Sequence, residues 1–464
     1  MTRPAYPNLA WSGGEPGAVR VLGINPWITD FAAFNLWSRP VGLLACLSMV
    51  RDAGASIALM DCLDPTWEGV RWPRPGRYGT GHYPKQELEP PKALAFTGRR
   101  YSRYGLDRDM VREALAQLDP APDAVMVSSV MTYWYPGAIN ALDLARELWP
   151  DAVRILGGPY ATLCADHAQR HARPDLLVRG SLETPENWAQ LWAALGRIAP
   201  PLPERAGLNL ALDLYNDPGY APVLGSRGCP FSCDYCASRA LYPGFTQSGP
   251  GPILALMEAE QARGVRDFAF YDDALLVAPD RWLWPVLDAV SDRWPQVRLH
   301  TPNAMHVRRL TPDACGRLKR GGLTTVRLGL ETTDFDLRHD VKLTRREWED
   351  GARNLVDAGF DLADIGVYIL FGLPGQDLAR VEEAVRHVRG FGFRPHLAHY
   401  TPIPGSPMFE AARQASPYPI AEEPLFQNNS IWPCVPGGFD WDQAARWKAL
   451  LQGLPAPGHG TAAD

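Results

Sequence analysis

The sequence predicts an α/β protein with two parallel-sheet units, a doubly wound domain followed by a partial barrel of six βα units. Three observations predict this fold. Short apolar runs alternate with amphipathic segments over most of the 464 residues, as in parallel sheets that are covered by helices. A Pro-rich and Gly-rich stretch, residues 197–220, separates two such series and reads as a linker. Loops rich in Gly and polar residues follow the predicted strands, where parallel sheets bind their ligands.

The first series predicts a doubly wound, Rossmann-like domain over residues 19–196, after a flexible start at residues 1–18. Each predicted strand is a short apolar run, and each predicted helix has apolar residues at helical spacing. The strands are predicted at 19–26, 56–62, 123–130, 152–158 and 175–180, and the helices at 40–55, 109–118, 137–150 and 184–196. Residues 64–108 are rich in Pro, Arg and Tyr, and they predict an irregular segment.

The second series predicts the partial barrel over residues 221–410, followed by a short, mostly helical C-terminal extension at residues 411–464. Its strands are predicted at 221–228, 267–272, 297–303, 325–331, 364–372 and 394–402, with helices between them. By analogy with complete (βα) barrels, the working face lies at the carboxyl ends of the strands. The extension contains a predicted helix at 441–454 and a frayed end.

Composition excludes several classes of protein. Hydrophobic residues make up 46% of the chain and charged residues 21%, so large cores are expected. The formal net charge of −6 gives no basic footprint for nucleic acid. No run approaches the roughly 20 apolar residues of a membrane span. The first residues also lack the apolar segment of a signal peptide. We therefore expect a cytoplasmic protein with no membrane or nucleic-acid partner.

Three of the eight cysteines cluster in "GCPFSCDYC", at Cys229, Cys233 and Cys236. Three thiolates suit an iron–sulfur cluster, and a [4Fe–4S] cluster with three protein ligands keeps one iron open. Structural zinc needs a fourth Cys or His, for which no second pair is obvious. Zinc and chance remain the alternatives. The other five cysteines are scattered along the chain, so we expect them to be small buried apolar side chains.

The run "RGCPFSCDYC", with Tyr235 before the last cysteine, resembles the signature of the radical S-adenosylmethionine (SAM) superfamily. The resemblance implies a partial (βα)6 barrel and a [4Fe–4S] cluster held by Cys229, Cys233 and Cys236. SAM would bind the open iron, and its reductive cleavage would give a 5′-deoxyadenosyl radical. The resemblance also implies an external electron donor, such as flavodoxin or ferredoxin, and a small-molecule substrate.

Further motifs resemble the SAM contacts of that superfamily: "YDDALL" (271–276), "RLGLET" (327–332) and "GVYILFGLPGQ" (366–376). Asn303 and His306 are added because they follow a predicted strand. Alternatives stay open, since the two aspartates could cap the next helix and "GLPG" could be only a turn. The SAM-binding residues of this prediction are Asp272, Asp273, Asn303, Glu331, Tyr368 and Gly372.

The N-terminal unit resembles the cobalamin-binding domain of one radical SAM subclass, in "INP", "RPVGLL", "LGGPYAT" and "RGSLET". The motif Asp-x-His-x-x-Gly, whose His ligates cobalt, is absent. Tyr160 stands where the subclass often has His, so a domain without corrinoid is the alternative. The predicted cobalamin-binding residues are Asn25, Pro26, Gly42, Leu43, Ser129, Met131, Gly157, Gly158, Tyr160 and Glu183.

By this resemblance, the expected function is cobalamin-dependent methylation of an unactivated carbon in a small molecule. The alternative within the superfamily is rearrangement, cyclisation or oxidation without methyl transfer. A methylthiotransferase fits poorly, because the resemblance would require a second three-cysteine cluster and a basic RNA-binding module. A non-enzymatic iron–sulfur or cobalamin sensor leaves the SAM motifs unexplained.

Two local patterns each allow two readings, and a third supports a single hypothesis. Cys164, His167 and His171 share a helix face and either hold a metal or simply pack. The aromatic loop "TYWYP" (132–136) either lines a cavity or fills an interdomain contact. Asn428 and Asn429 lie in a stretch that we expect to act as a lid over the barrel mouth.

Overall fold

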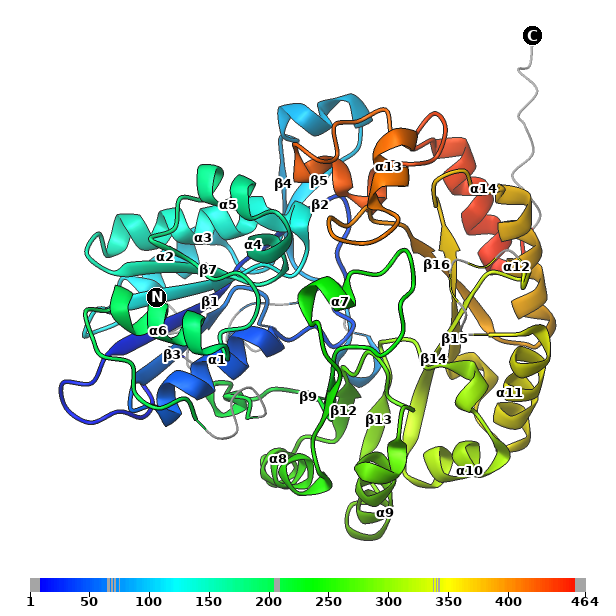
Figure 1. Cartoon of the computed structure of the whole chain (residues 1–464), viewed down its shortest axis with the longest axis horizontal. Coiled ribbons are helices and arrows are strands. Elements are labelled where there is room, and N and C mark those ends of the chain that lie inside the picture. The colour runs from blue at the N-terminus through cyan, green and yellow to red at the C-terminus, as the bar shows by residue number, and fades with distance from the viewer. Residues whose placement is uncertain are drawn as a thin grey trace.

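The computed structural model describes residues 9–64, 67, 70, 72–74, 76–203, 209–336, 338, 340 and 343–454. Part of the predicted flexible start, part of the predicted linker and the predicted frayed end lie outside the described residues. Two parallel sheets dominate the structure and lie side by side (Figure 1), the N-terminal one in blue to green and the second in green to orange.

The N-terminal sheet is parallel throughout. Its spatial order is β3 (Ser56–Asp61), β1 (Arg20–Asn25), β6 (Ala124–Ser128), β7 (Val153–Gly157) and β8 (Leu176–Leu177). Along the chain this is the order 2-1-3-4-5, the flavodoxin-like arrangement whose ligand site lies where the order reverses, between the first and third strands. The parallel α/β prediction for this unit is confirmed.

Helices cover both faces of this sheet, because successive strand residues point to opposite sides. On one face Val21 and Leu59 pack in the same core as Leu47. On the other face Leu22 and Met60 pack in a second core. The helices are α1 (Val41–Asp52), α2 (Arg108–Leu115), α3 (Tyr135–Leu148), α4 (Pro159–Leu163), α5 (Ala165–His171) and α6 (Pro185–Ala194). The first of these cores continues into the barrel, so the two units share buried apolar side chains.

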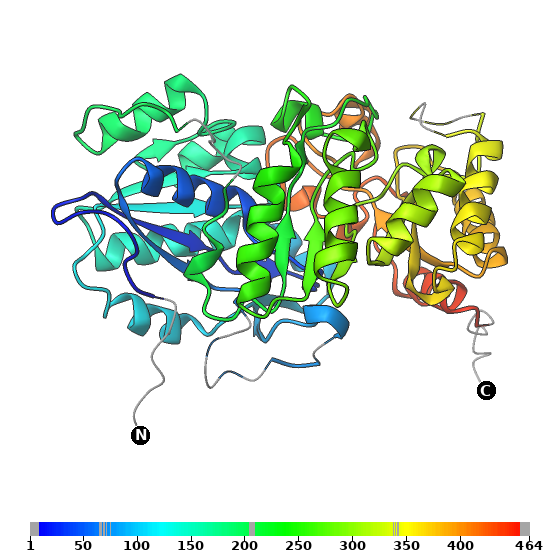
Figure 2. The same cartoon turned by 90° about the horizontal axis from the view of Figure 1, so that it is seen from below.

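The second sheet is a parallel, six-stranded partial barrel. Its strands follow one another in chain order: β9 (Ala221–Val223), β12 (Asp267–Phe270), β13 (Arg298–His300), β14 (Leu323–Glu331), β15 (Ile365–Phe371) and β16 (Arg394–His399). A helix of nine or more residues lies between each consecutive pair: α8 (Pro250–Ala262), α9 (Leu283–Arg293), α10 (Pro312–Arg320), α11 (Arg345–Asp357) and α12 (Leu378–Gly390). Figure 2 shows α8 and α9 in front of the strands. The predicted six βα units are confirmed.

The structure corrects two predictions about strands. Part of the segment 64–108 is not irregular, because β4 (Lys85–Leu88) and β5 (Tyr101–Tyr104) pair antiparallel, and β5 also pairs with β2 (Ile28–Asp30). The strand predicted at 221–228 is split. Only β9 belongs to the barrel, whereas β10 (Ser226–Arg227) pairs with β11 (Thr246–Gln247).

A buried cation joins the two units. Arg39, which is 5% exposed, lies 3.6 Å from both Asp61 and Asp64. Its guanidinium also sits 4.0 Å from the ring centre of Tyr215 and donates to the Pro218 carbonyl at 2.7 Å. Two carboxylates, an aromatic face and a carbonyl together compensate the desolvation of this charge. The segment before the barrel is therefore fixed to the carboxyl end of β3.

The C-terminal extension packs back over both units. It contains α13 (Phe409–Ala415) and α14 (Trp441–Gln452), the second of which confirms the helix predicted at 441–454. Between them, Asn428 is 1% exposed and donates to the Asp30 carboxylate at 2.8 Å. Trp134 donates to the other oxygen of the same carboxylate at 2.7 Å. Asn428 therefore belongs to a buried joint with the N-terminal unit, and the aromatic loop at 132–136 takes part in that joint.

Candidate active site

The three clustered cysteines lie in one loop, between β10 and the short helix α7 (Ser238–Leu241). Cys233 is buried, and Cys229 and Cys236 are half-buried. The Cys236 amide donates to the Cys233 carbonyl at 3.1 Å, which turns the chain between these two ligands. The Cys236 sulfur accepts from the Ser238 amide at 3.4 Å. The amide thus orients the Cys236 sulfur, and thiolates are the ligands that iron–sulfur clusters take.

The donor set of this loop fits an iron–sulfur cluster. All eight cysteines are described, and none forms a disulfide. Across the described part of the chain, no three His, Cys, Asp or Glu side chains gather as ligands of a single metal ion. Each cluster thiolate binds a separate iron, so cluster ligands need not converge on one point. A structural zinc site would need four ligands around one ion. The geometry therefore gives no support to zinc.

The two aspartates after β12 have different surroundings. Asp272 is 2% exposed and accepts from the Ser226 hydroxyl at 2.6 Å and the Gly225 amide at 3.3 Å. Burial raises the pKa of Asp272 to about 7. Asp273 lines the larger cavity described below, and burial raises its pKa as well. The next helical turns begin at Pro279 and Leu283, so neither aspartate caps them. Asp272 anchors the start of the cysteine loop, and Asp273 faces open space.

Glu331 ends β14 in a strained conformation. Its φ is +65°, a region that non-glycine residues seldom adopt and that is enriched at functional sites. The strand register shifts between Gly329 and Glu331, which re-aims the side chain. A Cβ on Gly329 would lie 2.6 Å from the Glu331 Oε1 atom, so only glycine leaves room for this carboxylate. Glu331 and Tyr235 of the cysteine loop line a cavity of about 230 Å³.

Tyr368 and Asn303, two further residues of the SAM prediction, form hydrogen bonds between segments at the ends of the barrel strands. The Tyr368 hydroxyl donates to the Pro302 carbonyl at 3.0 Å. The Asn303 amide group donates to the Tyr271 carbonyl at 2.8 Å. These bonds link the loops after β12 and β13 to β15, at the carboxyl end of the barrel. His306, the further candidate in this region, is buried and packs edge-on against Phe231 of the cysteine loop.

Gly372 begins the turn that follows β15, and its φ of +85° suits glycine. The Gln376 side-chain oxygen accepts from the Gly372 amide at 2.6 Å and from the Leu373 amide at 3.2 Å. Its amide group donates to the Leu370 carbonyl at 2.9 Å. "GLPGQ" is therefore a turn that the side chain of Gln376 stabilises through three hydrogen bonds. Leu373 and Gln376 line the same cavity as Glu331.

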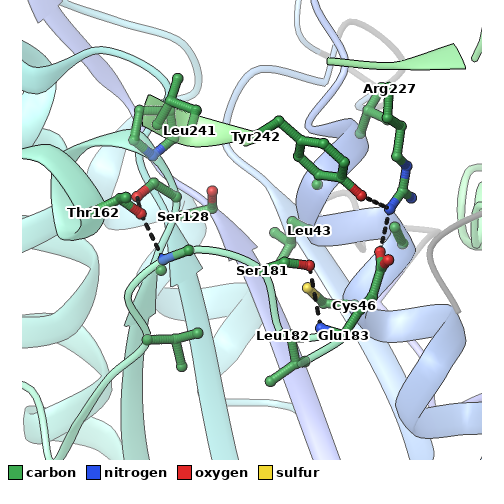
Figure 3. Close-up of a pocket in the computed structure, with 18 of the residues that line it drawn as sticks. Leu43, Cys46, Ser128, Thr162, Ser181, Leu182, Glu183, Arg227, Leu241 and Tyr242 are labelled. Carbon is green, nitrogen blue, oxygen red and sulfur yellow. Dashed lines mark hydrogen bonds and ion pairs between the residues drawn. The ribbon is translucent and has the colours of Figure 1, made fainter. Parts of the chain in front are cut away.

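A larger cavity of about 420 Å³ lies between the two units (Figure 3). On one side it is lined by the start of α1 and the carboxyl ends of β6 and β7, beside the point where strand order reverses. On the other side lie Arg227 and Gly228, which directly precede Cys229, together with α7 and the residues that follow β9 and β12. The three cysteines themselves are not among the lining residues. The lining is mostly apolar. Three of its polar side chains contact one another and form the polar rim of the cavity, namely Arg227, Glu183 and Tyr242. Asp273 also belongs to the lining.

Five predicted cobalamin residues line this cavity, namely Gly42, Leu43, Gly157, Gly158 and Glu183. The other five, which are Asn25, Pro26, Ser129, Met131 and Tyr160, lie outside its lining. Asn25 donates to the Asp61 carboxylate at 2.6 Å, and the Ser129 hydroxyl donates to the Met131 carbonyl at 2.9 Å. Pro26 is buried directly after β1.

Tyr160 lies away from the cavity because its side chain enters the core on the other face of the sheet. It is fully buried, and its hydroxyl lies 2.7 Å from the Nδ1 atom of His167. Burial lowers the pKa of His167 to about 4, so this imidazole is neutral at physiological pH. His167 stacks on His171, and no metal-binding group of three ligands is found here within the described residues. The packing reading therefore fits these residues.

The sequence did not single out Arg227, Tyr242 or Cys46, although all three line the cavity. Arg227 forms an ion pair with Glu183 and a 2.9 Å hydrogen bond to the Tyr242 hydroxyl. Burial raises the pKa of the Cys46 thiol to about 12, and the Glu183 carboxylate adds to the effect. The one sequence feature that could have indicated a role for any of them is the position of Arg227, directly before Gly228 and Cys229.

A protein-family model matches most of the barrel. Residues 223–388 match the family model of the radical SAM superfamily, so the barrel is a radical SAM domain and the superfamily prediction is confirmed. Radical SAM proteins are enzymes, and membership implies a [4Fe–4S] cluster and SAM. The family model does not extend over the N-terminal unit.

Two curated proteins are similar to this chain. An uncharacterized methyltransferase of Pyrococcus horikoshii is 22% identical over 348 residues, which cover 66% of this chain and 73% of that protein. The anaerobic magnesium-protoporphyrin IX monomethyl ester cyclase of Cereibacter sphaeroides is 22% identical over 349 residues, covering 66% of this chain and 56% of the cyclase. The match thus spans just over half the length of the cyclase.

Among solved structures, coproporphyrinogen III oxidase from Escherichia coli, described as a radical SAM enzyme, has a TM-score of 0.30 and 11% identity. The match covers 41% of this chain and 46% of that one. In the described part of the chain, no helix is both long and apolar enough to cross a bilayer.

Proposed function

We propose that this radical SAM enzyme binds cobalamin in the cavity between its two units and methylates an unactivated carbon of a small molecule. The observation that carries the proposal is the position of that cavity. It touches the carboxyl edge of a 2-1-3-4-5 sheet on one side and the cysteine loop on the other. Sheets of this order bind their ligands beside the strand reversal. The methyltransferase name of one relative agrees with the proposal.

The shape of the cavity supports a bulky ligand. Gly42 has nothing within 4 Å of the place where a Cβ would stand, and a Cβ on Gly157 would meet only Val178, at 3.9 Å. Both glycines therefore open space that larger residues would fill. The described residues that line the cavity include no histidine, and the Cys46 thiol is protonated at neutral pH. We therefore expect a bound corrinoid whose cobalt takes no ligand from this lining.

When loaded, the cluster and SAM supply a carbon-centred radical, and the corrinoid supplies the methyl group that is transferred. The residues of this chain orient and enclose these groups. Cys229, Cys233 and Cys236 would hold the cluster. Glu331, in the smaller cavity, and Asp273, in the larger one, would bind polar groups of SAM. An electron donor such as flavodoxin or ferredoxin would reduce the cluster. In this proposal residues 19–196 bind the corrinoid and residues 221–410 bind SAM.

The test is cofactor analysis of protein purified without oxygen after growth with hydroxocobalamin. The proposal predicts about four irons per chain, together with bound corrinoid. Gly42→Trp fills the cavity from α1 and should lose corrinoid while keeping its iron. Incubation with SAM and a reductant should yield both 5′-deoxyadenosine and S-adenosylhomocysteine once a methyl acceptor is supplied. A full complement of iron with no corrinoid would refute the cobalamin part.

The second candidate function is rearrangement, cyclisation or oxidation without methyl transfer. A relative named a cyclase is as similar to this chain as the methyltransferase is, which favours keeping this candidate. The two chemistries differ in their products. Methyl transfer releases S-adenosylhomocysteine, whereas the alternative gives 5′-deoxyadenosine without it.

A further inference from the structure

Arg227 is held from two sides at the start of the cysteine loop. Its guanidinium pairs with the Glu183 carboxylate of the N-terminal unit and donates to the Tyr242 hydroxyl at 2.9 Å. Figure 3 shows the Tyr242 hydroxyl and the Glu183 carboxylate both contacting the same Nη1 atom of Arg227. The Arg227 side chain is 13% exposed and that of Glu183 is 25% exposed, so water screens the pair only partly. A cation in this position has its charge compensated across the interface between the two units.

Hydrogen bonds of the neighbouring residues also fix the start of the loop. The β10–β11 ladder has two residue pairs, Ser226 with Gln247 and Arg227 with Thr246. The Ser226 hydroxyl bonds to Asp272, which secures one side. The next residue, Gly228, has a φ of +73° and leads directly into Cys229. The side chain of Arg227 is therefore one of the groups that hold the chain directly before the first predicted cluster ligand.

The same ion pair forms part of the cavity wall. Glu183 and Arg227 both line the cavity, and the Glu183 amide donates to the Ser181 hydroxyl oxygen at 3.2 Å in the same turn. A ligand that fills the cavity must contact this rim or displace it. A shift of Glu183 would change both the position and the charge balance of Arg227, next to the first cluster cysteine.

We propose that Arg227 is a positioning residue for the cluster and that Glu183 couples occupancy of the cavity to it. The proposal rests on the cluster of the proposed function but not on the identity of the cavity ligand. A reduced cluster with three thiolate ligands carries negative charge. Removing the Glu183 charge leaves Arg227 uncompensated, which favours the added electron. Removing the Arg227 charge does the opposite.

The experiment compares Glu183→Gln, Arg227→Gln and the double variant with the wild-type protein, after anaerobic reconstitution of the cluster. We expect the cluster potential to become more positive in E183Q and more negative in R227Q. The double variant should return toward wild type, because the two charges offset each other. The EPR spectrum of the reduced cluster should change in both single variants. Asp213→Asn is the matched control, since it breaks the Arg51–Asp213 pair elsewhere.

Unchanged potentials and spectra in folded single variants, or shifts of the same sign in both, would overturn the proposal. If E183Q does not fold, Tyr242→Phe removes the other hold on Arg227 and should change the spectrum without changing the charge. An unchanged Y242F spectrum then counts against the positioning role. A wild-type protein that takes up no iron would instead refute the proposed function, so the two failures are distinguishable.

Discussion

Gly228→Ala should destroy the cluster loop without touching any predicted ligand. Gly228 has a φ of +73°, where an alanine costs about 1–2 kcal/mol from its Cβ contacts alone. A Cβ at this position would also lie 2.0 Å from the Gly244 carbonyl oxygen, a backbone atom that cannot rotate away. Relief of this clash needs a backbone shift in one of the two segments. Because Cys229 is the next residue, the shift moves the first ligand.

The assay is iron content per chain after anaerobic reconstitution, together with 5′-deoxyadenosine formation from SAM. We expect G228A to lose most of its iron and nearly all SAM cleavage. Gly251→Ala is the control, because this glycine lies in α8, has a negative φ and has nothing within 4 Å of its Cβ position. Alanine there should stabilise the helix by roughly 0.5–1 kcal/mol. If G228A keeps as much iron as G251A, the close approach of Gly228 to Gly244 does not control ligand geometry.

Three further predictions follow from single residues. Cys233→Ala should abolish the cluster and SAM cleavage, and 5′-deoxyadenosine production by this variant would contradict the ligand assignment. Glu331→Gln should raise the Kd for SAM at least about tenfold, or 1.4 kcal/mol, at unchanged iron content, and equal affinities by calorimetry would refute the assignment. Burial raises the pKa of Asp272 from 3.8 to about 7, so the folded state holds a proton between these values that the unfolded state releases. Stability therefore falls as pH rises through this window, by up to about 4 kcal/mol. Asp272→Asn should remove that slope in urea unfolding at pH 5 and pH 8, and an unaltered slope would refute it.

The two parallel sheets were predictable because their strands are buried on both faces. Continuous apolar runs such as "AVMV" in β6 and "VYILF" in β15 stand out in the sequence, and helices with regular apolar spacing separate them. The third sheet was not predictable in this way. The β4 residues "KQEL" are exposed or half-buried, so they carry no apolar signal. Their partners in β5 lie 13 or more residues further along the chain.

The candidate site was predictable where the spacing of residues along the chain identifies metal ligands, as it does for Cys229, Cys233 and Cys236. Residue spacing does not predict whether a side chain points into a cavity, because this depends on the face of the sheet on which the loop residue packs. Gly158 and Tyr160 are two residues apart, yet one lines the cavity and the other lies in the opposite core. Arg227 and Cys46 line the cavity only because the two units pack against each other, which the sequence does not show.

The shared cavity gives the two-unit architecture a chemical reason. A radical formed at the cluster reacts with whatever lies near it, so a second reactive group is useful only within the same enclosed volume. Here the carboxyl ends of β6 and β7 and the cysteine loop line one cavity, and the buried Arg39 network and the Arg227–Glu183 pair fix the units on either side. A domain retained only for stability would be expected to fill this space with apolar side chains. Gly42 and Gly157 leave it open instead.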